Sequence, residues 1–306
     1  MKKIGFLFGD EVSFSNDIIE FINLKNNLDI IAEEIKIGIF NFENSLDYAV
    51  IFDRFSNKVP FYKTVLKFLN NKGIKIINYS DVPFFADKFV FLSELKKLKI
   101  NIPKTAIIPN KSLPVGIDDT MLRNLIYPLD WEETFKYIGF PAYILPNKLY
   151  DNFYNYVKVY NSQEFYSVYD NSDDNVLLLQ QTFEYDKHFR VLVVGDEKFI
   201  IGYNFFKPVK DRYYLIDEVI EQSLQKQINS NIKLIKKHYN IDMFFVDFGI
   251  KDKLYMLNSN IIQNVDYSYF PDECYKWLVK TTANFLIKCV ETPVVKKIVN
   301  KNTKKN

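Results

Sequence analysis

Short apolar runs bounded by charged residues constrain the fold of this chain most. The first run covers residues 3–8 and the second covers residues 47–54. Such a run is typical of a parallel strand that is covered on both faces. Helical sequence at 61–71 and another strand-like segment at 74–78 follow. This alternation of strand and helix predicts a small doubly wound α/β unit at the N-terminus.

Beyond this unit the pattern changes to pairs of strands with fewer helices, which indicates an α+β region. Gly195-Asp196 predicts the turn of a hairpin, and residues 110–130 read as a long loop. We expect strands at 102–109, 142–145, 156–159, 176–180, 189–194, 199–203, 244–250 and 254–257. We expect helices at 88–98, 131–138, 218–238 and 271–289.

The charge balance excludes several classes of partner. Forty basic and 38 acidic residues leave a net charge of +2, so no global field favours nucleic acid or a membrane surface. Five lysines cluster between residues 296 and 305, where residues 293–306 are expected to form a basic disordered tail. Two histidines are too few for a His-based metal site. No apolar run has the length of a signal peptide or a membrane span, so we expect a cytoplasmic protein.

Five weak motifs follow one another along the chain. They are Asn78 with Asp87-Lys88 and Ile102-Pro103-Lys104-Thr105, then Phe140-Pro141, then residues 179–183, then residues 188–195, and finally Val246-Asp247-Phe248 with Asn258-Ser259-Asn260. In this order they resemble the ATP-grasp superfamily of carboxylate–amine and carboxylate–thiol ligases. That superfamily includes glutathione synthetase-like and ribosomal-protein glutamate-ligase-like enzymes. The resemblance extends over residues 1–290.

The resemblance implies both an architecture and a reaction. Residues 1–82 would form the pre-ATP-grasp α/β domain, and residues 83–180 and 181–292 the two ATP-grasp subdomains. ATP would lie between the subdomains with Mg²⁺ on its phosphates. A small-molecule or peptide carboxylate would attack the γ-phosphate and release ADP, and an amine or thiol would then attack the acylphosphate and displace phosphate. Ligases of this type often pair, so a homodimer is an expectation.

The resemblance also implies roles for particular residues. Lys88 would reach the ATP phosphates, and Arg190 would face substrate or phosphate as the catalytic arginine. Asp247 and Asn260 would bind the metal. The adenine hinge would consist of Gln180, Gln181, Thr182 and Phe183, followed by Glu184. Glu184 has two interpretations, a hydrogen bond to ribose or an ordinary surface acid.

Three parts of this machinery depart from the family pattern. Leu145 stands where the family has its second phosphate-binding lysine, and no glycine occurs between Gly139 and Gly195, where a flexible Gly-rich lid is expected. The acidic metal ligand falls at Asn258, or at Leu257 if the register slips by one residue. The sequence therefore favours a divergent member with a degraded nucleotide site, either a weak nucleotide binder or a pseudo-ligase.

Two alternatives stay open on the sequence. An active ATP- and Mg²⁺-dependent ligase could use substitute groups, with Lys148 joining Lys88 and Arg190 on the phosphates. A protein or nucleic-acid interaction module could use the basic tail and the aromatic residues of segment 150–169. The near-neutral charge makes nucleic acid the weaker of these partners.

Overall fold

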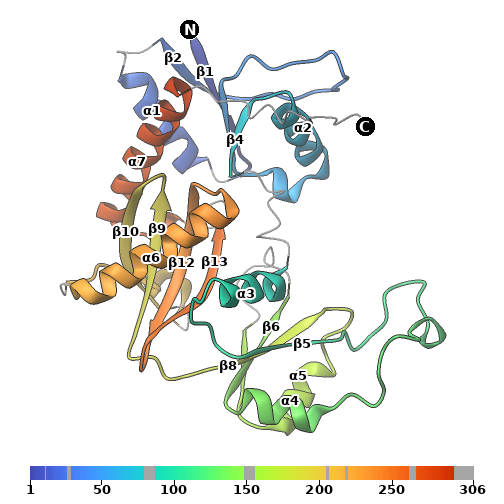
Figure 1. Cartoon of the computed structure of the whole chain (residues 1–306). Helices are drawn as coiled ribbons and strands as arrows, with labels where there is room; N and C mark the ends of the chain where they lie inside the picture. Colours follow the sequence, from blue (N-terminus) through green and yellow to red (C-terminus); the bar gives the residue numbers. More distant parts are fainter. Residues whose placement is uncertain are drawn as a thin grey trace, which may run out of the picture. The chain divides into compact units, whose positions relative to one another are not determined.

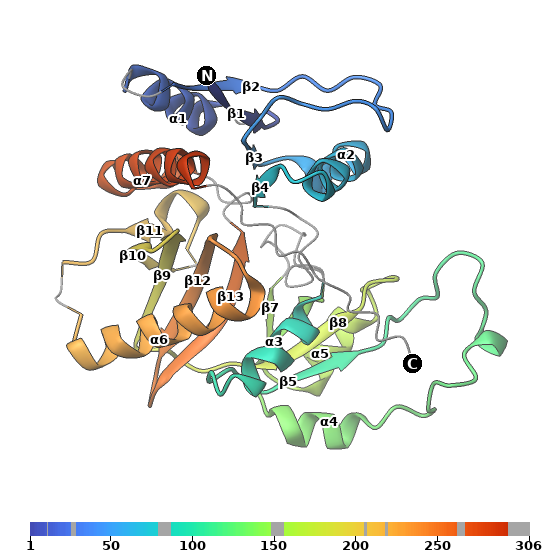
Figure 2. The same cartoon turned by 45° about the horizontal axis from the view of Figure 1, so that its top comes forward.

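The computed structural model describes residues 1–10, 12–25, 29–78, 87–147, 156–204, 207–217, 220–261 and 267–292. The chain divides into two compact units (Figures 1 and 2). The first unit is Met1–Asp81 with Asp272–Asn306, and the second is Val82–Pro271. The basic tail, Lys148 and the residues 150–155 of the aromatic segment lie outside the described residues.

The first unit is a four-stranded parallel sheet with strand order β2-β1-β3-β4, which confirms the predicted α/β unit. Its strands are β1 (Lys2–Leu7), β2 (Ile30–Glu34), β3 (Val50–Asp53) and β4 (Lys75–Ile77). Its helices are α1 (Ser13–Leu24), α2 (Pro60–Asn71) and α7 (Asp272–Glu291). The sequence missed β2 because this edge strand ends in two glutamates and buries only Ala32.

Helix α7 belongs to the first unit although it lies at the other end of the chain (Figure 1). It packs against α1, and Lys2 Nζ donates to the carbonyl of Val290, 3.0 Å away. The sequence placed this helix in the subdomain 181–292. An apolar stripe predicts that a helix is covered but does not tell which sheet covers it.

The second unit begins with an antiparallel sheet of order β5-β8-β6-β7. Its strands are β5 (Thr105–Ile108), β6 (Ala142–Pro146), β7 (Val157–Val159) and β8 (Leu177–Gln181). Helices α4 (Trp131–Ile138) and α5 (Ser162–Tyr169) cover one face. The sequence missed α5, whose Phe165 and Tyr169 are buried in the same cluster as Trp131. These aromatic residues are therefore core.

The other sheet of the second unit has the order β11-β10-β9-β12-β13. Its strands are β9 (Lys187–Val194), β10 (Glu197–Tyr203), β11 (Tyr213–Tyr214), β12 (Met243–Ile250) and β13 (Leu254–Ile261). The predicted hairpin at Gly195-Asp196 is confirmed. Helices α3 (Lys88–Lys97) and α6 (Gln222–Tyr239) pack on the face that carries Val191 and Val246.

A register shift in this second sheet positions polar side chains. Between β12 and β13, Asp247 pairs with Asn258, whereas Phe248 pairs with Met256, so Leu257 is the extra residue of a bulge. Four short 3-10 turns complete the described elements: Ser56–Lys58, Asp119–Met121, Val209–Asp211 and Tyr267–Tyr269. In the described parts of the chain, no helix has both the length and the apolar character needed to cross a membrane.

Candidate functional site

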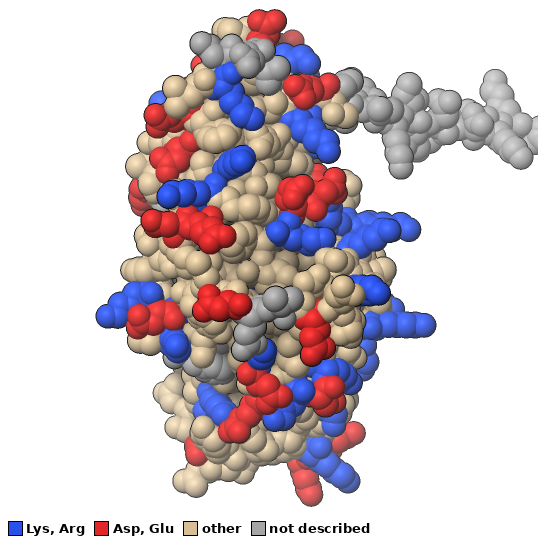
Figure 3. All heavy atoms as spheres, turned by 90° about the vertical axis from the view of Figure 1, so that its left-hand side faces the viewer, with Lys and Arg blue, Asp and Glu red and all other residues tan. Residues whose placement is uncertain are grey.

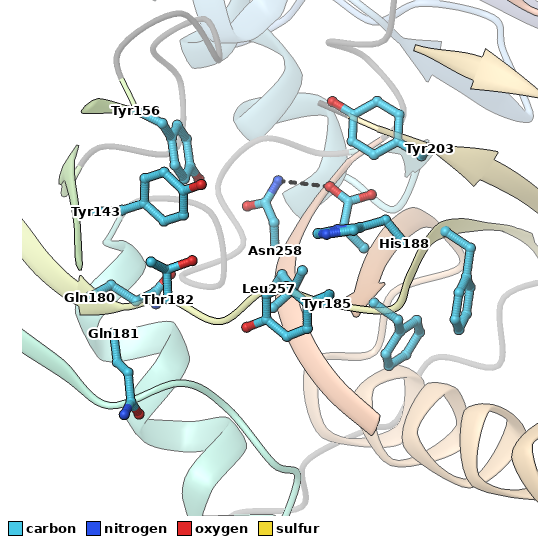
Figure 4. A pocket seen from close by; sticks show the side chains of 13 residues that line it. Tyr143, Tyr156, Gln180, Gln181, Thr182, Tyr185, His188, Tyr203, Leu257 and Asn258 are labelled. Carbon is cyan, nitrogen blue, oxygen red and sulfur yellow. Dashed lines mark hydrogen bonds between the residues drawn. The ribbon is translucent and has the colours of Figure 1, made fainter. Parts of the chain in front are cut away.

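A pocket lies within the second unit and has one wall from each sheet (Figure 4). About 590 Å3 of empty space lies between its walls, and this figure includes open solvent at the mouth. The first wall consists of Tyr143, Tyr156, Gln180, Gln181 and Thr182. The second consists of His188, Phe189, Tyr203, Asp247, Phe248, Leu257 and Asn258, and Tyr185 lies on the segment that links the sheets.

A buried ion pair lies at the second wall. Arg190 and Asp247 are direct partners across β9 and β12. The Arg190 Nε atom donates to Asp247 Oδ1 at 2.6 Å, and Nη2 donates to Oδ2 at 2.9 Å. Only 1% of Arg190 and 6% of Asp247 is exposed, so solvent screens this pair little. The geometry is the bidentate arrangement in which a guanidinium binds a carboxylate most strongly.

Aromatic groups hold the Arg190 guanidinium on its remaining sides. The ring centres of Tyr203 and Phe245 each lie 3.8 Å from the guanidinium carbon Cζ. The Nη1 atom donates to the Tyr213 hydroxyl at 2.7 Å. Burial by itself lowers the pKa of Arg190, but Asp247, Tyr213 and Tyr203 together outweigh burial and raise it. Arg190 is therefore a permanent cation committed to Asp247.

The described residues around Asp247 do not fit a magnesium ion. Mg²⁺ requires anionic oxygen ligands in octahedral geometry, and both Asp247 oxygens already accept from Arg190. Asn258 points its Nδ2 atom, a donor, at Asp247 Oδ2, 3.3 Å away. The Asn260 Oδ1 atom accepts from the backbone N–H of Ile261 at 2.7 Å. In the part of the chain that the structure describes, no group of three or more acidic, His or Cys side chains could hold a metal.

Lys88 is buried at the start of α3, where Asp87 caps the helix by accepting from the N–H of Val90. Its Nζ atom donates to the Tyr156 hydroxyl and lies 4.6 Å from the centre of that ring. Desolvation lowers the pKa of Lys88 to about 7, although the Asp247 charge opposes this shift. Lys88 itself is absent from the pocket wall, whereas its partner Tyr156 is part of it.

Asn147 fixes the position of Lys88. Its carbonyl accepts from the N–H of Lys88, and its Oδ1 accepts from the N–H of Phe89, both at 2.9 Å. We expect Asn147→Ala to reduce the free energy of unfolding by about 1 kcal/mol, because it removes the acceptor of a partly buried N–H. Chemical denaturation measures this loss. Asn147→Asp keeps an acceptor oxygen and should lose less, and equal losses would contradict this role.

Leu145 takes no part in binding charge. Its side chain is fully buried and lies on the same face of β6 as Tyr143, in the core cluster that contains Leu178. Alternate residues of a strand face opposite sides, so Ile144 belongs to the other core, under α4 and α5. Position 145 thus supplies apolar packing where the family would place an ammonium group.

The structure brings only part of the predicted adenine hinge to the pocket. Gln180, Gln181 and Thr182 line it, whereas Phe183 and Glu184 do not. The amide of Gln180 donates to Thr105 Oγ1 at 2.9 Å. Phe183 packs against Tyr255 with ring centres 5.1 Å apart. Glu184 is exposed, which agrees with its interpretation as a surface acid.

Comparison with solved structures identifies the architecture. No protein-family model matches the sequence, and no curated protein matches it. A RimK domain ATP-grasp protein from Sphaerobacter thermophilus superposes with a TM-score of 0.65 at 13% identity, over 95% of this chain and 100% of that one. The chain has the ATP-grasp fold. The sequence-based resemblance is thereby confirmed at the level of fold.

Two ligand complexes with this fold are also similar. The D-alanine–D-alanine ligase of Bacillus anthracis complexed with ATP has a TM-score of 0.61 and 18% identity, covering 95% of this chain and 99% of that one. A RiPP-associated ATP-grasp ligase of Chryseobacterium gregarium, in complex with ADP and a leader and core peptide, has a TM-score of 0.63 and 14% identity. The latter match covers 96% of this chain and 98% of that one.

Sequence reasoning gave no role to four tyrosines that line the pocket. They are Tyr143, Tyr156, Tyr185 and Tyr203. A signal was available for Tyr143, because it lies two residues before Leu145 and must share its face of β6. His188 lies two residues before Arg190 on β9, so it shares that face of the strand, and it lines the pocket. Burial lowers the pKa of His188, although the Asp247 charge opposes this shift.

The face of this chain drawn in Figure 3 carries mixed charge. Basic and acidic side chains are interspersed there rather than gathered in a patch of one sign. Exposed ion pairs such as Lys36–Glu34 and Lys111–Asp170 likewise place a basic side chain next to an acidic one. This face offers no basic stripe of the kind that nucleic acid requires.

Proposed function

We propose that this protein is a divergent ATP-grasp pseudo-ligase: a cytoplasmic protein that binds a ligand in the pocket of its second unit without magnesium-dependent phosphoryl transfer. The observation that carries the proposal is the bidentate Arg190–Asp247 pair. A guanidinium already neutralises the carboxylate that the family pattern assigns to the metal. Binding Mg²⁺ there would require breaking a buried ion pair, which is costly.

The residues at the positions expected to bind the ATP phosphates support the same proposal. Transfer of a phosphoryl group depends on cations that neutralise its developing charge. Of the family's two lysine positions, Lys88 is buried and bonded to Tyr156, and position 145 is a core leucine. We therefore propose that ATP binds weakly, through hinge contacts at Gln180–Thr182.

The proposed homodimer and the proposed subdomain boundary near residue 180 rest on the family resemblance. Analytical ultracentrifugation tests the homodimer.

The second candidate is an active ATP-dependent ligase that forms C–N bonds. It is supported by two similar structures, the ATP complex of a D-alanine–D-alanine ligase and the complex of a RiPP-associated ligase with ADP and a leader and core peptide. In this candidate Lys88, Lys148 and Arg190 bind phosphate, and Asp247 with Asn260 binds Mg²⁺. A small-molecule or peptide carboxylate would be the substrate.

Thermal unfolding with ATP distinguishes the two candidates. A ligand at about a hundredfold its dissociation constant adds about 2.7 kcal/mol of stability, which raises the midpoint by several degrees. We expect any shift with millimolar ATP to be the same in Mg²⁺ and in EDTA, and we expect no ADP release. Each protein is compared with its own midpoint in the absence of ATP. A shift that requires Mg²⁺ in the wild type and is absent in Asp247→Asn would favour the active ligase.

A further inference from the structure

The outer edge of strand β5 is open. β5 is the first strand of the sheet β5-β8-β6-β7, so only one of its sides pairs with a neighbour. The N–H of Gln181 donates to the carbonyl of Lys104 at 2.8 Å, and backbone groups alternate in direction along an antiparallel pair. The N–H groups of Thr105 and Ile107 therefore point away from β8, and in the described part of the chain they have no backbone acceptor.

Two other edge strands are covered by groups of the chain itself. On β2, the Asn23 side chain accepts from the N–H of Ala32 and donates to its carbonyl, both at 2.9 Å. On β13, the N–H of Met256 donates to the carbonyl of Asn101, also 2.9 Å away. Such cover matters because an unpaired strand edge binds other chains. At the edge of β5, in contrast, 44% of the apolar residue Ile107 is exposed.

The sequence along this edge is symmetric about Ala106. Pro103 and Pro109 each lie three residues from Ala106 and bring no N–H to the edge. In an antiparallel pair of two copies about Ala106, Thr105 of each copy lies opposite Ile107 of the other. Both outward N–H groups of each copy then have a carbonyl acceptor. Pro103 lies opposite Pro109 of the second copy, so the ladder ends at the same place on both strands.

We propose that β5 is the interface of a symmetric dimer, in which the edges of two copies pair antiparallel about Ala106. A two-fold axis suits this edge because each copy offers the other the same groups. Charge favours the same arrangement. Lys104 lies opposite Ile108 of the second copy, whereas parallel pairing in register would place the two Lys104 side chains together, which is unfavourable. The inference goes beyond the proposed function and does not depend on what the pocket binds.

The insertion 110–130 supplies the apolar area that this short ladder lacks. A stable interface buries about 800 Å2 on each partner. The insertion begins at the end of β5 and runs out from the sheet (Figure 1), and at its base the N–H of Ser112 donates to the carbonyl of Asp173 at 2.8 Å. Its exposed large apolar side chains are Val115, Ile117, Met121, Ile126 and Tyr127. In the symmetric pair these side chains cover the second copy, whereas a foreign peptide on the edge would leave them in water.

Sedimentation velocity of the full chain over a range of concentrations tests this interface. We expect a dimer, and we expect Ile107→Lys to weaken it about tenfold or more, because the substitution places charge on an apolar edge. The matched control is Val157→Lys, at a residue of similar exposure, 41%, on the opposite edge strand β7. This control should leave the dimer unchanged.

A disulfide tests the register. Ala106 of each copy would face its counterpart at a non-hydrogen-bonded position, where Cα atoms lie about 4.5 Å apart, within the range of a disulfide. Ala106→Cys should therefore cross-link the full chain into a dimer under mild oxidation. Val157→Cys is the matched control and should remain a monomer under denaturing, non-reducing conditions, since both native cysteines are buried.

Each contrary result has a separate meaning. A monomer at every concentration would overturn the inference and leave the edge to a strand of another protein. A dimer that Ile107→Lys leaves intact would also overturn it, and the homodimer would then use another surface. A dimer that Ala106→Cys does not cross-link would overturn the pairing about Ala106. None of these results affects the ATP test of the proposed function. If Ile107→Lys fails to fold, the cross-link of Ala106→Cys carries the test.

Discussion

Replacing Arg190 by methionine is expected to destabilise the second unit by about 3–5 kcal/mol. The substitution leaves the Asp247 carboxylate buried with 6% exposure and without its bidentate partner. It also removes the cation between the rings of Tyr203 and Phe245. Methionine fills much of the same volume, so the loss reports the charge more than the packing.

Urea denaturation of three variants measures this loss and separates the two charges. Asp247→Asn alone should cost a comparable amount, because it leaves a buried guanidinium without its counter-charge. The double variant Arg190→Met with Asp247→Asn should lose less than the sum, since no unpaired charge remains. Arg123→Met, at an exposed loop position, is the control and should change stability by less than about 0.5 kcal/mol.

The same series decides how Asp247 is used. If Asp247 served a metal, Mg²⁺ would stabilise the wild type, and Arg190→Met would cost little in its presence. We expect Mg²⁺ to have no effect on the wild type. If the loss of stability in the double variant equals the sum of the two single losses, the result would contradict an ion pair between Arg190 and Asp247.

The sequence predicted the fold because apolar periodicity is local. Runs such as 47–54 and the hairpin at Gly195-Asp196 specify their elements within a few residues of chain. Elements without such a local signal were missed: β2 buries a single alanine, and α5 lies in a segment whose aromatic residues had been considered for a surface. The attachment of α7 to the first unit depends on packing across the whole chain, which no local pattern contains.

The site was predictable one residue at a time but not as a set of contacts. An arginine on a buried strand requires a partner, and the sequence placed Arg190 on such a strand. Its partner Asp247 lies 57 residues away and is chosen by the pairing of β9 with β12. Likewise, Lys88 was recognised from its place before Pro103, whereas Tyr156, 68 residues on, was not. Long-range register decides which charges meet.

The burial of Lys88 gives a second large effect, on the pH dependence of stability. The pKa of Lys88 falls from 10.5 to about 7 on folding, chiefly through desolvation. Between these two values the unfolded chain binds more protons than the folded chain, so stability rises with pH in this window. Below pH 7 the lysine is protonated in both states and adds no slope. We expect a slope of up to about 1.4 kcal/mol for each pH unit between 7 and 10.

Denaturation of the wild type and Lys88→Met from pH 6 to pH 10 measures this contribution as a difference, which cancels the other titrating groups. The wild type should gain stability relative to Lys88→Met as the pH rises above 7. Lys96→Met, at an exposed position on the same helix, should run parallel to the wild type. A flat difference would mean that Lys88 keeps its charge in the folded state and remains available to phosphate. In that event ATP should bind more weakly to Lys88→Met than to the wild type, which would contradict the proposed loss of cations for the ATP phosphates.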